Sequence, residues 1–134
     1  MTVVHHNPAG VPRNPAFSQA VSVQGPSRTI YVGGQNGVVA DGSIVSDDIG
    51  AQTARALENL ETVLAAAGAA LENVVTWSIS IVEGQDVAEA FAAFQRAWGD
   101  RLDPPAISLS IVTGLANPRF LVEIGATAVR GADE

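Results

Sequence analysis

The chain has 134 residues, no cysteine, and seven Lys and Arg against fourteen Asp and Glu, for a formal net charge of -7. This length suits one domain, and the acidic balance argues against a protein that binds a nucleic acid backbone. The lack of cysteine excludes disulfides and thiolate metal sites. We find neither a basic leader followed by an apolar run nor an apolar stretch of membrane-spanning length, so we expect a cytoplasmic protein with no membrane partner.

Residues 1–16 contain three prolines and are expected to form an extended arm. Two strands are predicted at 17–23 and 29–32, and the turn residues between them favour a β-hairpin. The glycine-rich stretch that follows predicts a turn with at most a brief strand at 38–40.

Apolar residues recur at helical spacing over 47–67, which predicts the first helix. Asp47 and Asp48 suit the positive N-terminal end of that helix, and Gly68 is placed to end it. Strict alternation over 74–82 predicts a half-buried strand.

A second helix is predicted to begin at Asp86, with Glu89 in an arrangement like a capping box, and to end before Gly99. Two last strands are predicted at 106–112 and 120–129. The apolar stripe of this helix consists of Val87, Phe91, Phe94 and Trp98.

The predicted order is therefore strand, strand, helix, strand, helix, strand, strand (ββαβαββ). This order indicates an α+β sandwich in which two helices cover one face of a mostly antiparallel sheet. We expect a single domain over 17–130 and a C-terminal tail at 131–134. The last strand is largely nonpolar on both faces, and the chain is 47% hydrophobic but only 16% charged, so we expect another subunit to cover the open face.

Glu123 is the one carboxylate inside the last two predicted strands. Alternation places it on the same face as Leu121, Gly125 and Thr127, in low-dielectric surroundings that favour a protonated carboxylic acid. A group of this kind is suited to general acid or base catalysis. The alternative is a structural carboxylate that pairs with an arginine across an interface or points outward at a strand end.

The other polar residues offer less chemistry. Ser108 and Ser110 have no histidine nearby in the sequence to activate a hydroxyl. His5 and His6 are the only histidines, and we interpret them as part of a mobile arm rather than as a pair of metal ligands. No metal site is predicted.

The GGQNG turn at 33–37 lacks the lysine of a phosphate-binding loop, so we expect its glycines to permit unusual backbone angles or close approach to another chain. Trp77 and Trp98 are expected in the core or at an interface. Arg119 and Arg130 flank the last strand, where they are either solvated or available to hold an anionic group.

Six segments, in this order and spacing, make the chain similar to the Rid superfamily of reactive intermediate deaminases, also called the YjgF family: PAFSQAV (15–21), YVGGQ (31–35), AQTARALENLETVLAAAGA (51–69), LENVVTWSISI (71–81), PPAISLSIV (104–112) and FLVEIGATAV (120–129). The resemblance implies a chorismate-mutase-like α+β protomer and a homotrimer with a pocket at each subunit interface. It also implies that no cofactor or metal is needed. In the deaminase branch, water attacks an enamine or imine and releases ammonia and a 2-keto acid.

The resemblance assigns roles to individual residues. Glu123 matches the glutamate that positions or activates water, and Ile107 occupies the place of the arginine that clamps the substrate carboxylate. Losing that bidentate contact forfeits on the order of 1.5 to 3 kcal/mol. The implied substrate-binding residues are Phe17, where many members have Tyr, Gly33, where many have Ser, and Gly34, Gln35, Ile107, Leu109 and Arg119.

Three hypotheses follow. The first is an Arg-less hydrolase of the deaminase type, with Glu123 as acid and base, acting on a neutral or weakly polar metabolite rather than a standard 2-imino acid. The second is a noncatalytic trimer that binds a small ligand or a regulatory partner. The third is an endoribonuclease, which the net charge and the lack of a basic stripe disfavour.

Overall fold

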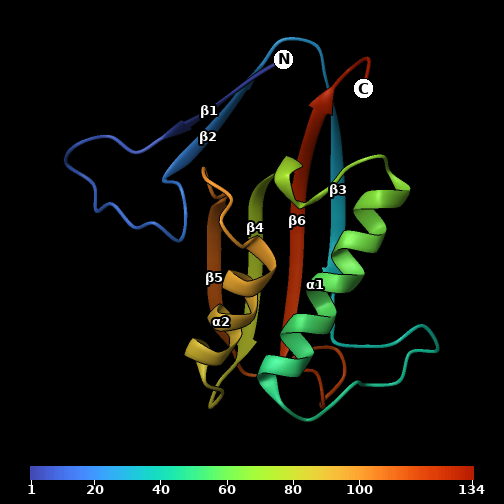
Figure 1. Cartoon of the computed structure of the whole chain (residues 1–134). Helices are drawn as coiled ribbons and strands as arrows, with labels where there is room; N and C mark the ends of the chain where they lie inside the picture. The colour runs from blue at the N-terminus through green and yellow to red at the C-terminus, as the bar shows by residue number, and fades with distance from the viewer.

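Two helices cover one face of a four-stranded sheet in the computed structural model, which describes residues 1–134 (Figure 1). The two antiparallel pairs are β3 with β6 and β6 with β4, whereas β5 runs parallel to β4. The predicted α+β class, with both helices on one face, is thus confirmed. In sheet order the strands are β3 (Ser27–Gln35), β6 (Val122–Gly131), β4 (Val74–Val82) and β5 (Ala106–Val112).

Helix α1 (Ile49–Ala66) has the boundaries that its end signals predict. The Asp48 side chain accepts a hydrogen bond of 2.9 Å from the Ala51 N–H and so caps the first turn. Gly68, with φ of +77°, follows the last turn and lets the chain leave the helix, as predicted. A short 3-10 turn, η1 (Leu71–Asn73), then leads into β4.

Helix α2 (Val87–Trp98) connects β4 to the parallel strand β5. Asp86 caps it by accepting a 2.9 Å hydrogen bond from the Ala88 N–H, and Gly99, with φ of +64°, ends it. The predicted span is confirmed, but the most deeply buried residues of α2 are the small Ala90 and Ala93 rather than the aromatic stripe.

The core lies between the helices and the sheet. The inward positions of β4 and β6 alternate with outward ones, as a half-buried strand requires. The fully buried aliphatic side chains that fill this layer are Leu60, Leu64, Ile79, Ile81, Val122 and Ile124.

The predicted β-hairpin of 17–23 and 29–32 is wrong. Strand β2 (Ala20–Gln24) pairs instead with β1 (Thr2–His6), a strand inside the predicted arm, while β3 pairs along its length with β6. Figure 1 shows the β1–β2 ribbon projecting away from the four-stranded sheet. The turn residues between β2 and β3 therefore separate two sheets instead of joining neighbouring strands.

The two histidines are held in β1. His5 Nδ1 lies 2.9 Å from the Ser18 hydroxyl oxygen, and His6 Nε2 lies 2.8 Å from the Ser22 hydroxyl oxygen. Their side chains point to different partners, as expected of neighbours in an extended strand. The interpretation of a mobile arm around these histidines was wrong, because β1 has a paired strand to hold it.

The open face of the sheet carries hydroxyl groups and glycines rather than the apolar surface that we predicted. Register pairs Thr76 with Thr127 and Ser78 with Gly125, and Ser78 also with Ser108 on β5. Glu123 is the only charged residue among these outward positions of β4, β5 and β6. The prediction that this face carries few charges is confirmed, but the prediction that it is apolar is wrong.

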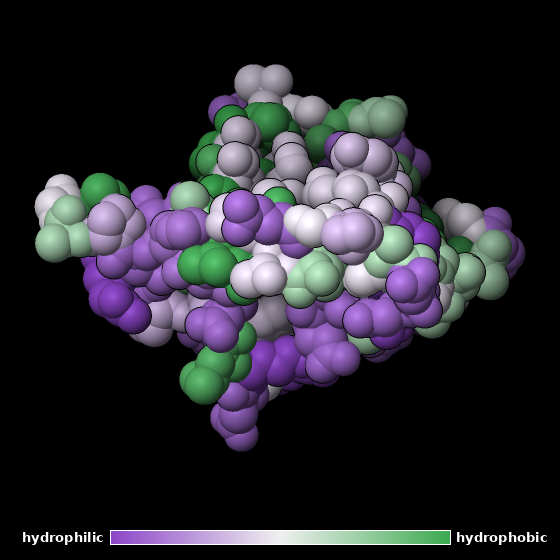
Figure 2. All heavy atoms as spheres, turned by 90° about the horizontal axis from the view of Figure 1, so that it is seen from above, coloured by the Kyte–Doolittle hydropathy of each residue, from purple (hydrophilic) through white to green (hydrophobic).

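Neither α1 nor α2 combines the length and the hydropathy that a membrane-crossing helix needs. Figure 2, which looks onto the end of the molecule where both termini lie, shows strongly hydrophilic residues gathered over the lower half of the view. Pale and apolar residues dominate the upper part. The hydrophilic surface is therefore distributed unevenly around this end of the molecule.

Candidate functional site

Glu123 lies on β6 in the open face of the sheet, opposite Ser80 of β4. Its side chain is half-buried, and within the chain no hydrogen bond or ion pair reaches its carboxylate. Leu121, which we predicted beside it, precedes β6 and packs against the hydrophobic core instead. The immediate strand neighbours of Glu123 on this face are thus Ser80 and Gly125, so the predicted apolar wall is absent from the single chain.

The backbone of Gly34 lies close against the Glu123 side chain. A methyl group on Gly34 would lie 2.6 Å from Glu123 Cδ and 2.7 Å from Cγ, which is closer than two carbon atoms can approach. The β3–β6 register shifts between Val32 and Gln35, and this irregularity brings the glycine backbone under the carboxylate. We predicted unusual backbone angles or close approach to another chain for the glycines of this turn; Gly34 instead approaches Glu123 of its own chain, and Gly33, Gly34 and Gly37 all have negative or extended φ angles.

Gly33 and Gln35 complete this group. The Gln35 Nε2 donates a 3.2 Å hydrogen bond to the Gly33 carbonyl, and Gln35 stands opposite Ile124, the neighbour of Glu123 on β6. No atom lies within 4 Å of a methyl group placed on Gly33. We call Glu123, Gly33, Gly34 and Gln35 the carboxylate site.

Ile107 and Leu109 lie on the other face of the sheet. They pair with Trp77 and Ile79 of β4, whose side chains are buried under the helices. Phe17 is half-buried and lies near the start of β5, because the next residue, Ser18, donates from its N–H to the Pro105 carbonyl at 3.1 Å. A single chain therefore does not bring these residues to Glu123.

Arg119 is directed away from the carboxylate site. Its Nη2 and Nε lie 2.9 and 3.3 Å from Asp47 Oδ1, and both side chains of this pair are largely exposed. Arg130 binds the Gly68 carbonyl and Glu134. No arginine of the same chain pairs with Glu123, and the substrate-binding role of Arg119 stays a prediction.

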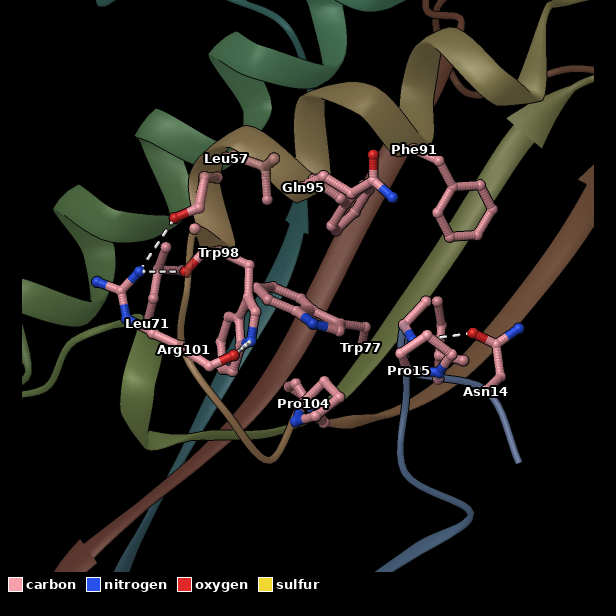
Figure 3. A pocket seen from close by; sticks show the side chains of 16 residues that line it. Asn14, Pro15, Leu57, Leu71, Trp77, Phe91, Gln95, Trp98, Arg101 and Pro104 are labelled. Atoms are coloured by element: carbon pink, nitrogen blue, oxygen red, sulfur yellow. Dashed lines mark hydrogen bonds between the residues drawn. The ribbon is translucent and has the colours of Figure 1, made fainter.

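A cavity of about 300 Å³, which the sequence did not predict, lies on the helix side of the sheet. Figure 3 shows Trp77, Phe91 and Trp98 around it, with Pro15 and Pro104 at its edge. We call it the aromatic cavity. Trp77 is buried in the core as predicted, but both tryptophans also line this space.

Gln52 was also missed, although it fixes the chain just before Glu123. It is fully buried on α1, and its Nε2 donates to the carbonyls of Ser46 and Arg119 at 2.8 and 3.0 Å. Its Oε1 accepts a 2.9 Å hydrogen bond from the Leu121 N–H. No sequence signal distinguishes this glutamine from a surface residue of an amphipathic helix.

Replacing Gln52 by Leu is expected to lower the free energy of unfolding by about 2 to 4 kcal/mol, because buried backbone groups lose their partner. Urea unfolding would measure this. The matched control is Gln24→Leu on β2, where the side chain is exposed and makes no hydrogen bond, and the expected change is within ~0.5 kcal/mol. Equal midpoints for the two variants would contradict the structural role of Gln52.

Comparison with known proteins gives consistent matches. A family model described as "Endoribonuclease L-PSP" matches residues 11–130. The chain is 33% identical over 117 residues to the 2-iminobutanoate/2-iminopropanoate deaminase of Rattus norvegicus, covering 87% of this chain and 81% of the rat protein. A RutC family protein of Pyrococcus abyssi is 33% identical over 85 residues, which is 63% of this chain and 65%, slightly under two thirds, of that relative.

Among solved structures, a protein of unknown function of the conserved Rid family from Yersinia pestis superposes with a TM-score of 0.83 at 36% identity. The superposition covers 96% of this chain and 98% of the Yersinia chain. The match extends through β6 and hence includes the strand that carries Glu123.

Proposed function

The chain belongs to the Rid superfamily, and we propose that it is a cofactor-independent hydrolase of the deaminase type that acts on small imines or enamines. Glu123 is the proposed general acid and base. One observation carries this proposal: Glu123 stands without an intrachain partner above Gly34, on a face of the sheet that holds no other charge.

The proposed reaction converts an imine and water into a carbonyl compound and ammonia. The Glu123 carboxylate accepts a proton from water as the water oxygen forms a bond to the imine carbon. Glu123 returns this proton to the imine nitrogen, which gives a neutral carbinolamine. Glu123 then accepts the hydroxyl proton and passes it to the same nitrogen as the C=O bond forms and the C–N bond breaks, so that ammonia leaves and the carboxylate is restored.

The substrate that best suits this site has no carboxylate beside the reacting carbon. Ile107 offers no charge, and Arg119 is held by Asp47. An apolar wall penalises an unpaired carboxylate through desolvation. We therefore propose a neutral or weakly polar imine or enamine.

The proposed assembly is a homotrimer with a pocket at each interface. Glu123 and Ile107 lie on opposite faces of the sheet of one protomer, so a pocket that contains both must take them from two copies. Size-exclusion chromatography with light scattering tests the assembly directly.

Ammonia release from a panel of neutral imines, measured against 2-iminobutanoate and 2-iminopropanoate, tests the proposed substrate preference. We expect turnover of neutral imines to exceed that of the two 2-imino acids. The reverse order would contradict the substrate class. Ligand-dependent thermal stabilisation without any ammonia release would instead support the noncatalytic alternative.

Replacing Ile107 by Arg is expected to raise kcat/KM for 2-iminopropanoate by about tenfold or more, because a guanidinium offers the carboxylate two charge-assisted hydrogen bonds. Ile107→Gln is the matched control, since it adds polarity without charge and should leave the low rate unchanged. An inert Ile107→Arg variant with an intact assembly would mean that residue 107 does not decide the substrate.

The word endoribonuclease in the name of the matching family model raises a second activity, which we do not favour. The net charge is -7, and both histidines lie on β1, where they are hydrogen-bonded to Ser18 and Ser22. An acidic chain of this kind lacks the basic stripe that a nucleic acid backbone requires.

A further inference from the structure

We propose that Asn36 is a positioning residue, which holds the main chain of β6 so that the Glu123 carboxylate stays aligned for proton transfer, and that Asn59 of α1 holds Asn36. This role rests on the proposed function of Glu123. Neither asparagine belongs to the carboxylate site, and we assign neither of them a contact with the substrate. The expected consequence is that kcat depends on a hydrogen bond made one residue away from the acid.

The turn that follows β3 holds β6 on both sides of Glu123. The Asn36 Nδ2 donates a 3.0 Å hydrogen bond to the carbonyl of Val122, the residue directly before Glu123. Gln35 pairs with Ile124, the residue directly after it. Because β3 ends at Gln35, the Asn36 side chain continues the support of β6 where the backbone pairing with β3 has stopped.

Helix α1 fixes the main chain around Asn36. The Asn59 Nδ2 donates to the carbonyls of Asn36 and Val38 at 3.1 and 2.8 Å. Arg55, one helical turn earlier, donates from its Nε to the same Val38 carbonyl at 3.1 Å. Both donors start from the interior of an 18-residue helix, which places them more precisely than a loop would. The turn is therefore tied to a rigid element on both sides of Gly37.

Gly37 lets the turn lie directly on α1. It is buried, and a methyl group at this position would lie 2.6 Å from the Gln52 Cα, which is closer than two carbon atoms can approach. The Gln52 Oε1 in turn accepts a hydrogen bond from the Leu121 N–H. Helix α1 thus holds the chain before Glu123 by two routes, one through Gln52 to Leu121 and one through Asn36 to the residue after it.

The two routes differ in how much of the fold depends on them. Gln52 is fully buried, and its amide binds main-chain groups of both the loop before α1 and the segment before β6. Asn36 is half-buried, and its side chain binds only the Val122 carbonyl. Removing the Asn36 amide should therefore destabilise the protein less than removing Gln52, so its effect on the acid is measurable in a folded protein.

The Glu123 carboxylate depends on this main chain for its position. No hydrogen bond or ion pair within the chain reaches the carboxylate, so its direction follows from the β6 backbone and from its contact with Gly34. A displacement of about 1 Å can lower a rate by roughly 10²-fold. A freed Val122 carbonyl allows a smaller shift at the next residue, for which we expect a loss of about tenfold.

The test compares Asn36→Leu with Asn73→Leu in the full-length protein. Leu at position 36 keeps the approximate size of the side chain but cannot donate to the Val122 carbonyl. Asn73, in η1 before β4, is also half-buried, and its Oδ1 accepts a 2.9 Å hydrogen bond from the Ala70 N–H. It therefore matches Asn36 in burial and in bonding but not in position. Asn36→Ala removes the same donor without adding an apolar side chain and serves as a second variant.

Ammonia release is measured with butan-2-imine, in which a methyl group replaces the carboxylate of 2-iminobutanoate. We expect Asn36→Leu to lower kcat by about tenfold and to change KM by less than about twofold. Asn36→Gln, which keeps an amide donor, should recover part of the loss. Asn73→Leu should keep both constants while lowering the urea midpoint about as much as Asn36→Leu does.

A double variant separates alignment of the acid from a general effect on the fold. In the Glu123→Gln background, Asn36→Leu should cause no further fall in kcat, because no acid remains to be aligned. A purely structural asparagine would lower kcat by the same factor in both backgrounds.

The position of the Glu123 carboxylate is also followed by ¹³C NMR without any substrate. The side-chain Cδ resonance of Glu123, assigned by its loss in Glu123→Gln, should shift in Asn36→Leu and in Asn36→Ala and stay in place in Asn73→Leu. This measurement decides the positioning role independently of turnover, whereas ammonia release from the unmodified protein decides the proposed function.

An unmoved Glu123 resonance in the two Asn36 variants would overturn the proposal, and so would an unchanged kcat. A full tenfold loss that recurs in the Glu123→Gln background would make Asn36 a general structural residue, which also contradicts it. Absent ammonia release from the unmodified protein, together with a shifted resonance, would refute the hydrolase and still support the role of Asn36 in placing Glu123.

Discussion

If the proposed function holds, replacing Glu123 by Gln is expected to lower kcat for imine hydrolysis by about 10²- to 10⁴-fold, because the amide neither accepts a proton from water nor returns one to the leaving nitrogen. The shape of the side chain is retained, and no intrachain hydrogen bond to Glu123 is lost. The free energy of unfolding should therefore stay within ~0.5 kcal/mol of the original. Steady-state ammonia release and urea unfolding measure the two quantities.

The matched control for this substitution is Glu83→Gln. Glu83 is exposed and follows directly after β4, away from the carboxylate site. The kcat and KM of the Glu83→Gln variant should therefore be unchanged. Full activity of the Glu123→Gln variant would remove Glu123 from the chemistry. The carboxylate would then be structural, as the alternative interpretation of the sequence proposed.

Replacing Gly34 by Ala is expected to lower kcat by about 10²-fold while leaving KM nearly unchanged, because the added methyl group displaces the Glu123 carboxylate. The methyl carbon would lie 2.6 Å from Glu123 Cδ and 2.9 Å from Oε1. A shift of the acid by a fraction of an ångström to one ångström misaligns the proton transfer without removing the acid. Steady-state kinetics separate kcat from KM.

Gly114→Ala is the control for Gly34→Ala. Gly114 follows β5 and lies outside the carboxylate site, and a methyl group there meets no atom within 4 Å. The Gly114→Ala variant should therefore keep its rate. Equal losses in both variants would mean that displacement of Glu123 is not the cause, and no loss in Gly34→Ala would mean that the carboxylate can move aside without consequence.

Local signals allowed both helices to be predicted well. Asp48 and Asp86 each cap a first turn, and Gly68 and Gly99 each follow a last turn with a positive φ. These features depend on residues within a few positions of one another, so a sequence displays them directly. The strands β4, β5 and β6 were found for a similar reason, because alternation is local.

Strand pairing could not be predicted in the same way. The turn at Gly25 and Pro26 favoured a hairpin between β2 and β3, yet β2 pairs with β1 and β3 with β6. The register of β3 with β6 joins residues about a hundred positions apart, such as Ser27 and Gly131. Contacts this distant leave no mark in a short window of sequence.

The sequence suggested residues for the candidate site but not how they lie relative to one another. Alternation grouped Glu123 with Gly125 and Thr127 on one face, but the neighbours that pairing supplies, Ser80 and Gly34, come from other strands. The aromatic cavity was missed because Trp77 and Trp98 belong to different elements, each with its own apolar pattern. Only packing of α2 against β4 brings them around one space.

The sheet separates the acid from the hydrophobic wall. Glu123 on β6 and Ile107 on β5 project in opposite directions, so a change at one position need not repack the surroundings of the other. Under the proposed function, the residue at position 107 could therefore change the substrate preference while Glu123 and Gly34 stay as they are. Because the two positions share no contact within the protomer, we expect their effects on the free energy of unfolding to add.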